Sequence, residues 1–312
     1  MNRRNLLTLL AAPTFAAAQE SSLVERLGHP KEAKLLILHA DDVGMCHSVN
    51  VATTRAMEQG VVSSASIMVP CPWMPEIARY CREHPTADFG LHLTLTSEWQ
   101  HYRWRPVTPI GEVPGLLDAE GFIHRSVEGT LLKASAEEVE KEIRNQILRA
   151  RQFGIEPTHV DSHMGTLFTG KFFNTYLKVA KEQKVMPMLP AAVSPDRTAV
   201  NRLTGLDPTR AMADARKQGF IVLDLLNTGE PGNTLEERRD NYYKLLRGLK
   251  PGVTEIIVHL SMDDEEIRNI TGNWRARWNE FQIFTDPKTR ELIDSLGIKL
   301  VGYRELAKLW KP

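Results

Sequence analysis

Short apolar runs alternate with amphipathic segments along most of the chain, and this alternation predicts strands followed by helices. The clearest apolar run, Leu35 to Leu38, carries no charge, which is typical of a strand buried on both faces of a parallel sheet. We therefore predict a strand at residues 34–40. The neighbouring carboxylates Asp41 and Asp42 follow, and we place them in the loop at the carboxyl end of that strand, where the sites of α/β proteins collect.

Two adjacent carboxylates repel each other, so Asp41 and Asp42 need a cation, a proton or hydrogen bonds to offset that repulsion. Two interpretations are open at this point. The pair can be a polar turn in which one carboxylate caps the next helix, or it can belong to a metal or catalytic site.

The same patterns predict further elements. Apolar or β-branched runs predict strands at 61–69, 88–95, 157–163, 185–189, 220–226, 254–260 and 298–301. Helical periodicity predicts helices at 47–60, 76–83, 135–154, 171–183, 209–218, 235–249, 286–296 and 303–309. The helix at 135–154 has the clearest signal, because Ser135 and Glu138 form a capping box ahead of an apolar stripe.

The repeated order of strand and helix indicates a mainly parallel sheet with right-handed crossovers. About seven such units fit an α/β fold of the distorted (β/α) barrel type, similar to a TIM barrel. We expect a single domain over residues 20–312, and an open doubly wound sheet is the alternative. Neither GxGxxG nor GxxxxGK[ST] follows the first strand, so nucleotide binding is not supported.

Composition excludes some classes of partner. The chain of 312 residues has 39 Lys+Arg and 39 Asp+Glu, so its formal net charge is zero. Without a basic excess, nucleic acid is not an expected partner. The three cysteines have no CxxC spacing, which argues against a disulfide framework or a zinc–thiolate site. Cys71 and Cys81 could pair in an oxidising compartment.

Residues 1–19 have the features of an export signal peptide. Arg3 and Arg4 give a positive start, and Leu6 to Ala12 form an apolar core too short to span a bilayer. The two arginines also resemble a twin-arginine signal, and a general secretory signal or an uncleaved anchor is the alternative. We expect a periplasmic or extracellular protein with no membrane association beyond this segment.

The long segment at 98–122 is irregular and rich in aromatic, proline and glycine residues. A loop of this length inside a compact domain is usually functional or disordered. Trp99 and Trp104 could stack on a sugar ring of a substrate. Alternatively, they could pin the loop to the body of the protein, and the sequence leaves both interpretations open.

Four predicted strands end in side chains that bind metals or transfer protons. They are Asp41 and Asp42, then His92, then His159, Asp161 and His163, and finally His259. The carboxyl ends of parallel barrel strands meet at one mouth, so we expect these side chains to lie close together. Alternation along a strand places His159, Asp161 and His163 on one face, with His163 nearest the mouth. A metal held by a set of Asp and His ligands keeps coordination positions free for water and substrate, as in hydrolytic metal sites.

These residues lie in segments that resemble the YdjC/ChbG family of carbohydrate deacetylases. In the family's order, the matching segments are His39-Ala40-Asp41-Asp42-Val43-Gly44 with Asn50, Ser63 to Val69, Gly90 to Leu95, and Pro157-Thr158-His159-Val160-Asp161-Ser162-His163. The match runs over most of the chain after the leader. The resemblance implies a distorted (β/α) barrel that hydrolyses the N-acetyl group of small chito-oligosaccharides with a divalent metal, and it suggests a homodimer.

The resemblance also implies roles for single residues. By position, Asp42, His92 and His163 match the metal ligands of the family. Asp41 matches the catalytic base, and His259 matches a histidine near the end of the family's fold that would serve as the general acid.

His159 and Asp161 would then orient His163 or Asp41 without binding the metal themselves. Because the ligand set lacks sulfur, Mg²⁺, Zn²⁺, Mn²⁺ and Co²⁺ all suit it, with Mg²⁺ or Zn²⁺ preferred.

Three positions depart from the family's pattern. His39 stands where the family often has Asn, Met164-Gly165-Thr166 follows His163 in place of a histidine-rich run, and Leu260-Ser261 follows His259 in place of proline. These departures leave the implied metal set intact but border the substrate. Two other functions therefore stay open, namely a glycan-binding barrel that has lost turnover and a metal hydrolase for another amide or ester.

Overall fold

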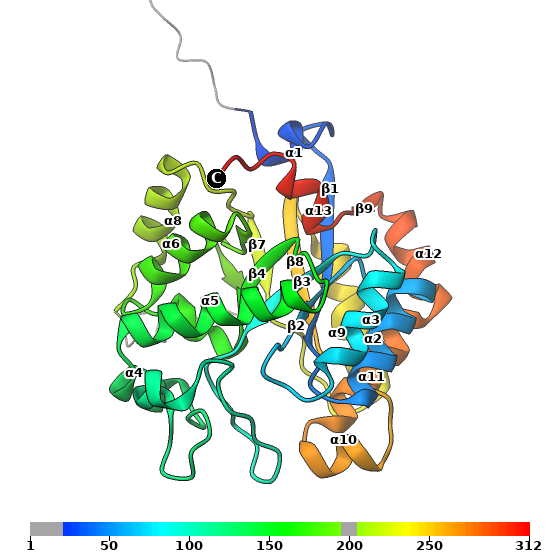
Figure 1. The fold of residues 1–312 in the computed structure, drawn as a ribbon. Coiled ribbons are helices and arrows are strands. Elements are labelled where there is room, and N and C mark those ends of the chain that lie inside the picture. Colours follow the sequence, from blue (N-terminus) through cyan, green and yellow to red (C-terminus); the bar gives the residue numbers. More distant parts are fainter. Residues whose placement is uncertain (1–20, 195–204) are drawn as a thin grey trace, which may run out of the picture.

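A computed structural model describes residues 21–194 and 205–312, and the predicted export signal at 1–19 lies outside them. Within these ranges, nine parallel strands form one sheet in the order β5-β4-β3-β2-β1-β8-β7-β6, with β9 also paired to β1 (Figure 1). The strands are β1 (Lys34–Val43), β2 (Ser64–Ile67), β3 (Phe89–Leu93), β4 (His159–Ser162), β5 (Met186–Pro187), β6 (Val193–Ser194), β7 (Leu225–Asn227), β8 (Gly252–Val258) and β9 (Ile298–Leu300).

The strand order is that of a barrel rather than of a doubly wound sheet. Strands follow the chain around the sheet, and β8 returns to pair with β1 from Lys34 with Gly252 to Ala40 with Val258. The edge strands β5 and β6 belong to one stretch of chain, residues 186–194, in which β5 pairs with β4 and β6 pairs with β7. A parallel bridge from Pro190 to Leu223 connects the residues between them to the segment before β7. The predicted distorted (β/α) barrel is therefore confirmed.

Helices flank the sheet (Figure 1). They are α1 (Leu23–Arg26), α2 (His47–Gln59), α3 (Met74–Glu83), α4 (Val127–Lys133), α5 (Ala136–Gln152), α6 (Phe173–Gln183), α8 (Pro208–Lys217), α9 (Leu235–Gly248), α10 (Glu265–Ile270), α11 (Trp274–Thr285), α12 (Pro287–Ser295) and α13 (Tyr303–Ala307). Short 3₁₀ turns lie at Ile110–Glu112, Pro114–Leu116 and His163–Phe168. No helix in the described part of the chain is long and apolar enough to cross a membrane.

Most predicted elements are present, although several strands are shorter than expected and β1 is longer. The predicted strand at 61–69 contracts to β2, because pairing with β1 and β3 is confined to Ser64–Ile67, and the one at 220–226 contracts to β7. Helix α5 begins after its cap Ser135, and both hydrogen bonds of the predicted capping box form. The sequence did not predict α4, α10 or α11.

The first strand forms the centre of the sheet. Leu35 to Leu38 are fully buried, as their uncharged run predicts, and they join one core that extends through the barrel strands and the facing helices. Pairing with β8 from Lys34 to Ala40 gives β1 one continuous register. The carboxyl end of β1 is thereby held rigidly where the candidate side chains lie.

Candidate active site at the carboxyl ends of the strands

Asp41 and Asp42 lie inside β1 and not in the loop after it, which corrects the sequence prediction. A β-bulge explains the difference, because Ala40 and Val43 of β1 pair with Ala65 and Ile67 of β2, leaving one extra residue on β1. Asp42 takes up that residue with a φ of 68°. Neighbouring side chains of a regular strand point to opposite faces, and the bulge turns both carboxylates toward one site.

Three side chains from different strands converge at this point. Asp42 Oδ1 lies 3.5 Å from His92 Nε2 and 3.3 Å from His163 Nδ1. All three residues are buried, and Asp42 Oδ1 has no hydrogen-bond partner among the described residues. An unpartnered buried carboxylate oxygen is costly unless a cation or a proton satisfies it.

The remaining nitrogen of each histidine contacts a carboxylate. His92 Nδ1 donates to Asp161 Oδ1 at 2.6 Å, and His163 Nε2 donates to Glu98 Oε2 at 3.0 Å. Each ring therefore presents its other nitrogen to Asp42 Oδ1, as histidines that ligate metals do. Ligand atoms about 2.1 Å from a tetrahedral metal lie about 3.4 Å apart, which matches the separations found here.

Electrostatics also favour a cation at this cluster. Burial alone would raise the pKa of Asp42, but the Arg277 guanidinium and nearby histidines hold it well below its usual range. Burial alone would lower the pKa of His163, but Glu98 and Asp42 raise it to about 10. The carboxylates thus bind positive charge strongly at this position, and a divalent ion would compete with protons for it.

His39 and His159 lie deeper in the barrel than this cluster. His39 Nε2 lies 3.2 Å from Asp41 Oδ1 and 3.1 Å from Asp161 Oδ2, so it bridges two carboxylates. His159 is fully buried and stacks on Tyr303 with ring centroids 3.8 Å apart. Burial, and next the charge of His39, lower the pKa of His159 well below its usual value. His163, and not His159, therefore accompanies Asp42 and His92, although His39, His159 and Asp161 form a second group that could hold a cation.

His259 follows β8 and is more exposed than the other predicted Asp and His residues of the site, all of which are buried. Its side chain is 38% exposed, and its Nε2 lies 3.9 Å from Asp41 Oδ2. The backbone N–H of His259 donates to Glu280 Oε2 at 2.7 Å. His259 can therefore face a substrate on the open side of the cluster while its backbone is held.

Three residues of the site were not predicted from the sequence. Glu98 contacts His163, Arg277 Nη2 lies 2.6 Å from Asp42 Oδ2, and Glu280 contacts His259. Arg277 and Glu280 lie on α11, whose buried face mixes charged and apolar side chains and so lacks a simple apolar stripe. The only sequence signal for Glu98 is a carboxylate shortly after a strand.

The aromatic loop packs on itself beside the cluster. Trp104 is only 3% exposed, and its ring centroid lies 5.4 Å from that of Trp99 and 6.3 Å from that of His163. This burial matches the interpretation that Trp104 pins the loop. Trp99 is partly exposed, so of the two tryptophans it is the one whose ring could contact a sugar. Cys71 and Cys81 are both free thiols.

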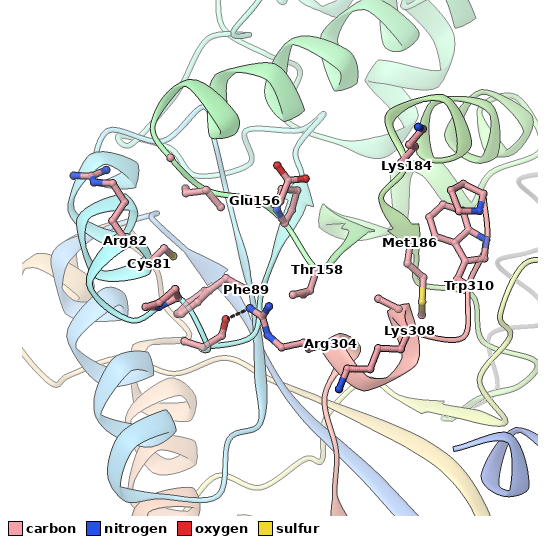
Figure 2. A pocket seen from close by; sticks show the side chains of 17 residues that line it. Cys81, Arg82, Phe89, Glu156, Thr158, Lys184, Met186, Arg304, Lys308 and Trp310 are labelled. Carbon is pink, nitrogen blue, oxygen red and sulfur yellow. Dashed lines mark hydrogen bonds between the residues drawn. The ribbon is translucent and has the colours of Figure 1, made fainter. Parts of the chain in front are cut away.

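A cavity of about 720 Å³ lies elsewhere, at the opposite ends of the strands. Phe89 and Met186 at the starts of β3 and β5, with Thr158, Arg304 and Trp310, are among the residues that line it (Figure 2). None of the converging Asp and His side chains is among them. Cavity size therefore does not locate the chemistry, whereas the polar convergence at the carboxyl ends does.

Comparison with known proteins shows the family of this chain. The family model of YdjC-like proteins matches residues 35–295. The chain belongs to the YdjC-like family. The resemblance of the Asp-Asp and His-x-Asp-Ser-His segments to that family is thus confirmed.

Relatives of this YdjC-like chain align over nearly their full lengths. A carbohydrate deacetylase of Thermus thermophilus is 30% identical over 271 residues, covering 87% of this chain and 93% of that protein. A chitooligosaccharide deacetylase of Yersinia enterocolitica is 27% identical over 288 residues, covering 87% and 99%. The structure of an Enterococcus faecalis protein, described as a candidate cellobiose-phosphate cleavage protein, matches with a TM-score of 0.72 at 25% identity, covering 88% of this chain and 99% of that one.

Proposed function

We propose that the protein is a divalent-metal-dependent hydrolase that removes N-acetyl groups from acetamido sugars or chito-oligosaccharides. The observation that carries the proposal is the convergence of Asp42 Oδ1, His92 Nε2 and His163 Nδ1 beside a second carboxylate, Asp41. The names of the aligned relatives supply the substrate class, an acetylated carbohydrate.

Asp42, His92 and His163 would hold the metal. One carboxylate oxygen and two imidazole nitrogens leave coordination positions free, and they suit Zn²⁺, Mg²⁺, Mn²⁺ or Co²⁺. When bound, the cation would supply Lewis acidity for the attacking water and for the carbonyl oxygen of the acetyl group.

Asp41 would accept a proton from the attacking water. Its Oδ1 contacts His39 at 3.2 Å, whereas its Oδ2 faces the cluster, 3.7 Å from His92 Nε2 and 3.9 Å from His259 Nε2. Water then forms the new C–O bond at the acetyl carbon, and the C–N bond to the sugar breaks. His259 donates a proton to the departing amine, so the products are a free amino sugar and acetate.

Carboxylates hold the histidines of the site in the orientation that this chemistry needs. Asp161 fixes His92, Glu98 fixes His163, and His39 links Asp161 to Asp41. Buried hydrogen bonds to charged groups favour one ring orientation strongly. The amide and water can therefore meet groups that need no rearrangement during the reaction.

We also propose that the protein acts after export, in the periplasm or outside the cell. This part rests on the leader-like composition of residues 1–19. Localisation of the full chain, with and without Arg3 and Arg4 changed to lysine, tests it. Retention of the wild type in the cytoplasm would contradict the proposal.

The direct test of the activity is acetate release from N-acetylglucosamine oligomers, with and without a chelator. We expect activity that chelation abolishes and added metal restores, and almost none from Asp42→Ala. Activity that ignores chelation, or that survives in Asp42→Ala, would reject the proposal. Tight glycan binding without acetate release would indicate a binding protein, and faster release from acetylated esters would indicate a different hydrolase.

A further inference from the structure

Helix α11 carries two buried charged side chains that both point at the candidate active site. Arg277 is 6% exposed and Glu280 is 4% exposed, and residues three apart share one face of a helix. Charged side chains are rarely buried unless each has a partner. The partners of these two residues belong to two neighbouring strands, Asp42 to β1 and His259 to the position directly after β8.

Arg277 acts on the carboxylate of Asp42. Its Nη2 lies 2.6 Å from Asp42 Oδ2, and the two residues are 235 positions apart in the chain. Among the described residues its Nε and Nη1 have no hydrogen-bond partner, so Asp42 is its one hydrogen-bonded contact. Occupation of Oδ2 by Arg277 leaves Oδ1 as the oxygen that faces His92 and His163.

Arg277 also offsets an unfavourable backbone conformation. Asp42 has a φ of 68°, a value that residues other than glycine adopt seldom and at some cost. A charge-assisted hydrogen bond to its side chain stabilises this conformation. Asp42 is thus held both by the bulge of β1 and by α11.

Glu280 acts on the backbone of His259. Its Oε2 accepts the His259 N–H at 2.7 Å, while its Oε1 accepts from Tyr242 Oη and Arg238 Nη1, both at 2.8 Å. Tyr242 and Arg238 belong to α9, so this helix holds the carboxylate oxygen of Glu280 that does not contact His259. A change at Glu280 would therefore move His259 relative to Asp41.

We propose that α11 is the positioning element of the active site. Arg277 sets the oxygen of Asp42 that receives the cation, and Glu280 sets the distance between His259 and the reacting nitrogen of the substrate. The inference rests on the proposed function, and its two halves have separate readouts. Arg277 governs metal affinity, whereas Glu280 governs the rate of the chemical step.

The first half is tested by calorimetric titration of the full chain with Zn²⁺ alone. We expect Arg277→Gln to weaken Zn²⁺ binding by about 10–100-fold, the usual effect of removing a group that orients a ligand. Arg277→Lys should recover part of the loss, because the contact to Asp42 is a single hydrogen bond. Arg275→Gln makes the same change at an exposed position of the same helix and should bind Zn²⁺ like the wild type.

The second half is tested by the kinetics of acetate release from Glu280→Gln. Only the oxygen of a glutamine amide accepts hydrogen bonds, whereas its NH₂ group donates, so the side chain cannot accept from His259 N–H on one side and from Arg238 on the other. We expect kcat to fall by about tenfold or more, because general acid catalysis contributes about 10²–10⁴-fold. The KM and the Zn²⁺ affinity of Glu280→Gln should stay within about twofold of wild type. The control Glu291→Gln changes an exposed residue, and its kcat, KM and Zn²⁺ affinity should all stay within about twofold of wild type.

Failure of the inference can be told from failure of the proposed function. Wild-type Zn²⁺ affinity in a folded Arg277→Gln overturns the first half, and an unchanged kcat in Glu280→Gln overturns the second. Equal losses of metal affinity and kcat in both variants would indicate a general structural role. That result would overturn the inference that Arg277 governs metal affinity and Glu280 governs the chemical step. If the wild type releases no acetate but Arg277→Gln still loses Zn²⁺ affinity, the metal half stands while the substrate assignment and the His259 half are rejected.

Discussion

Asp161 lies between two histidines, which makes Asp161→Asn a stringent test of how the site is held together. Its Oδ1 accepts from His92 Nδ1 at 2.6 Å, and its Oδ2 accepts from His39 Nε2 at 3.1 Å. Burial would raise the pKa of Asp161, but His92 and His39 lower it well below its usual value. The ionised carboxylate therefore fixes both rings with an N–H toward itself, and His92 Nε2 is left to face Asp42.

Asparagine cannot reproduce both contacts of Asp161, because only one of its two side-chain atoms accepts hydrogen bonds. If its NH₂ group faces His92, that ring takes the tautomer with a proton on Nε2, the nitrogen proposed to bind the metal. If the NH₂ group faces His39, the bridge from His39 toward Asp41 is disturbed. We expect the variant to lose about 10–100-fold in metal affinity, equivalent to about 1.4–2.7 kcal/mol.

The assay is calorimetric titration with Zn²⁺, combined with kcat/KM for acetate release. Asp88→Asn is a matched control, because Asp88 is also buried and hydrogen-bonded but lies at the opposite ends of the strands, where it accepts from Thr158 and from the Arg304 N–H. The control should leave Zn²⁺ affinity unchanged. Wild-type affinity and wild-type kcat/KM in a folded Asp161→Asn would refute the reasoning that this carboxylate orients His92.

The other predictions concern the same site and the strands that support it. Glu98→Gln should weaken Zn²⁺ binding by about tenfold in calorimetry, because the amide no longer orients His163 as a carboxylate does; unchanged affinity would show that the contact between Glu98 and His163 is incidental. Zn²⁺ affinity should rise with pH between about pH 6 and about pH 8, because the raised pKa of His163 means that a cation must displace a tightly held proton; a flat profile would contradict this competition. Gly90→Ala should lower the free energy of unfolding by about 1–3 kcal/mol in urea denaturation, since its Cβ would lie 2.4 Å from the buried His159 ring; a variant as stable as the wild type would show that the ring can move away.

Local pattern was enough to predict the barrel and the order of its main strands, although not the residues at which each strand ends. The uncharged run at 35–38 and the repeated order of strand and helix carry that information, because burial on both faces and parallel pairing leave a direct trace in the residues. The placement of Asp42, His92 and His163 together follows from the same rule, since parallel strands bring their carboxyl ends to one mouth.

The bulge and α11 could not be predicted in this way. The bulge of β1 depends on pairing with β2, and no residue near Asp42 signals that one position of β1 will stay unpaired. Helix α11 buries Arg277 and Glu280 toward partners that are remote in the chain, so its face does not show an apolar stripe. Local sequence patterns identify side chains at the carboxyl ends of the strands. They do not identify the charged residues of another helix that contact those side chains.

The central claim is that Asp42, His92 and His163 hold one catalytic cation. The most direct measurement is a crystal structure of the Zn²⁺-loaded protein with anomalous diffraction data collected on either side of the zinc absorption edge. We predict a single strong zinc peak within about 2.0–2.2 Å of Asp42 Oδ1, His92 Nε2 and His163 Nδ1. A zinc peak held instead by His39 and His159, or a loaded crystal with no peak at this cluster, would contradict the account.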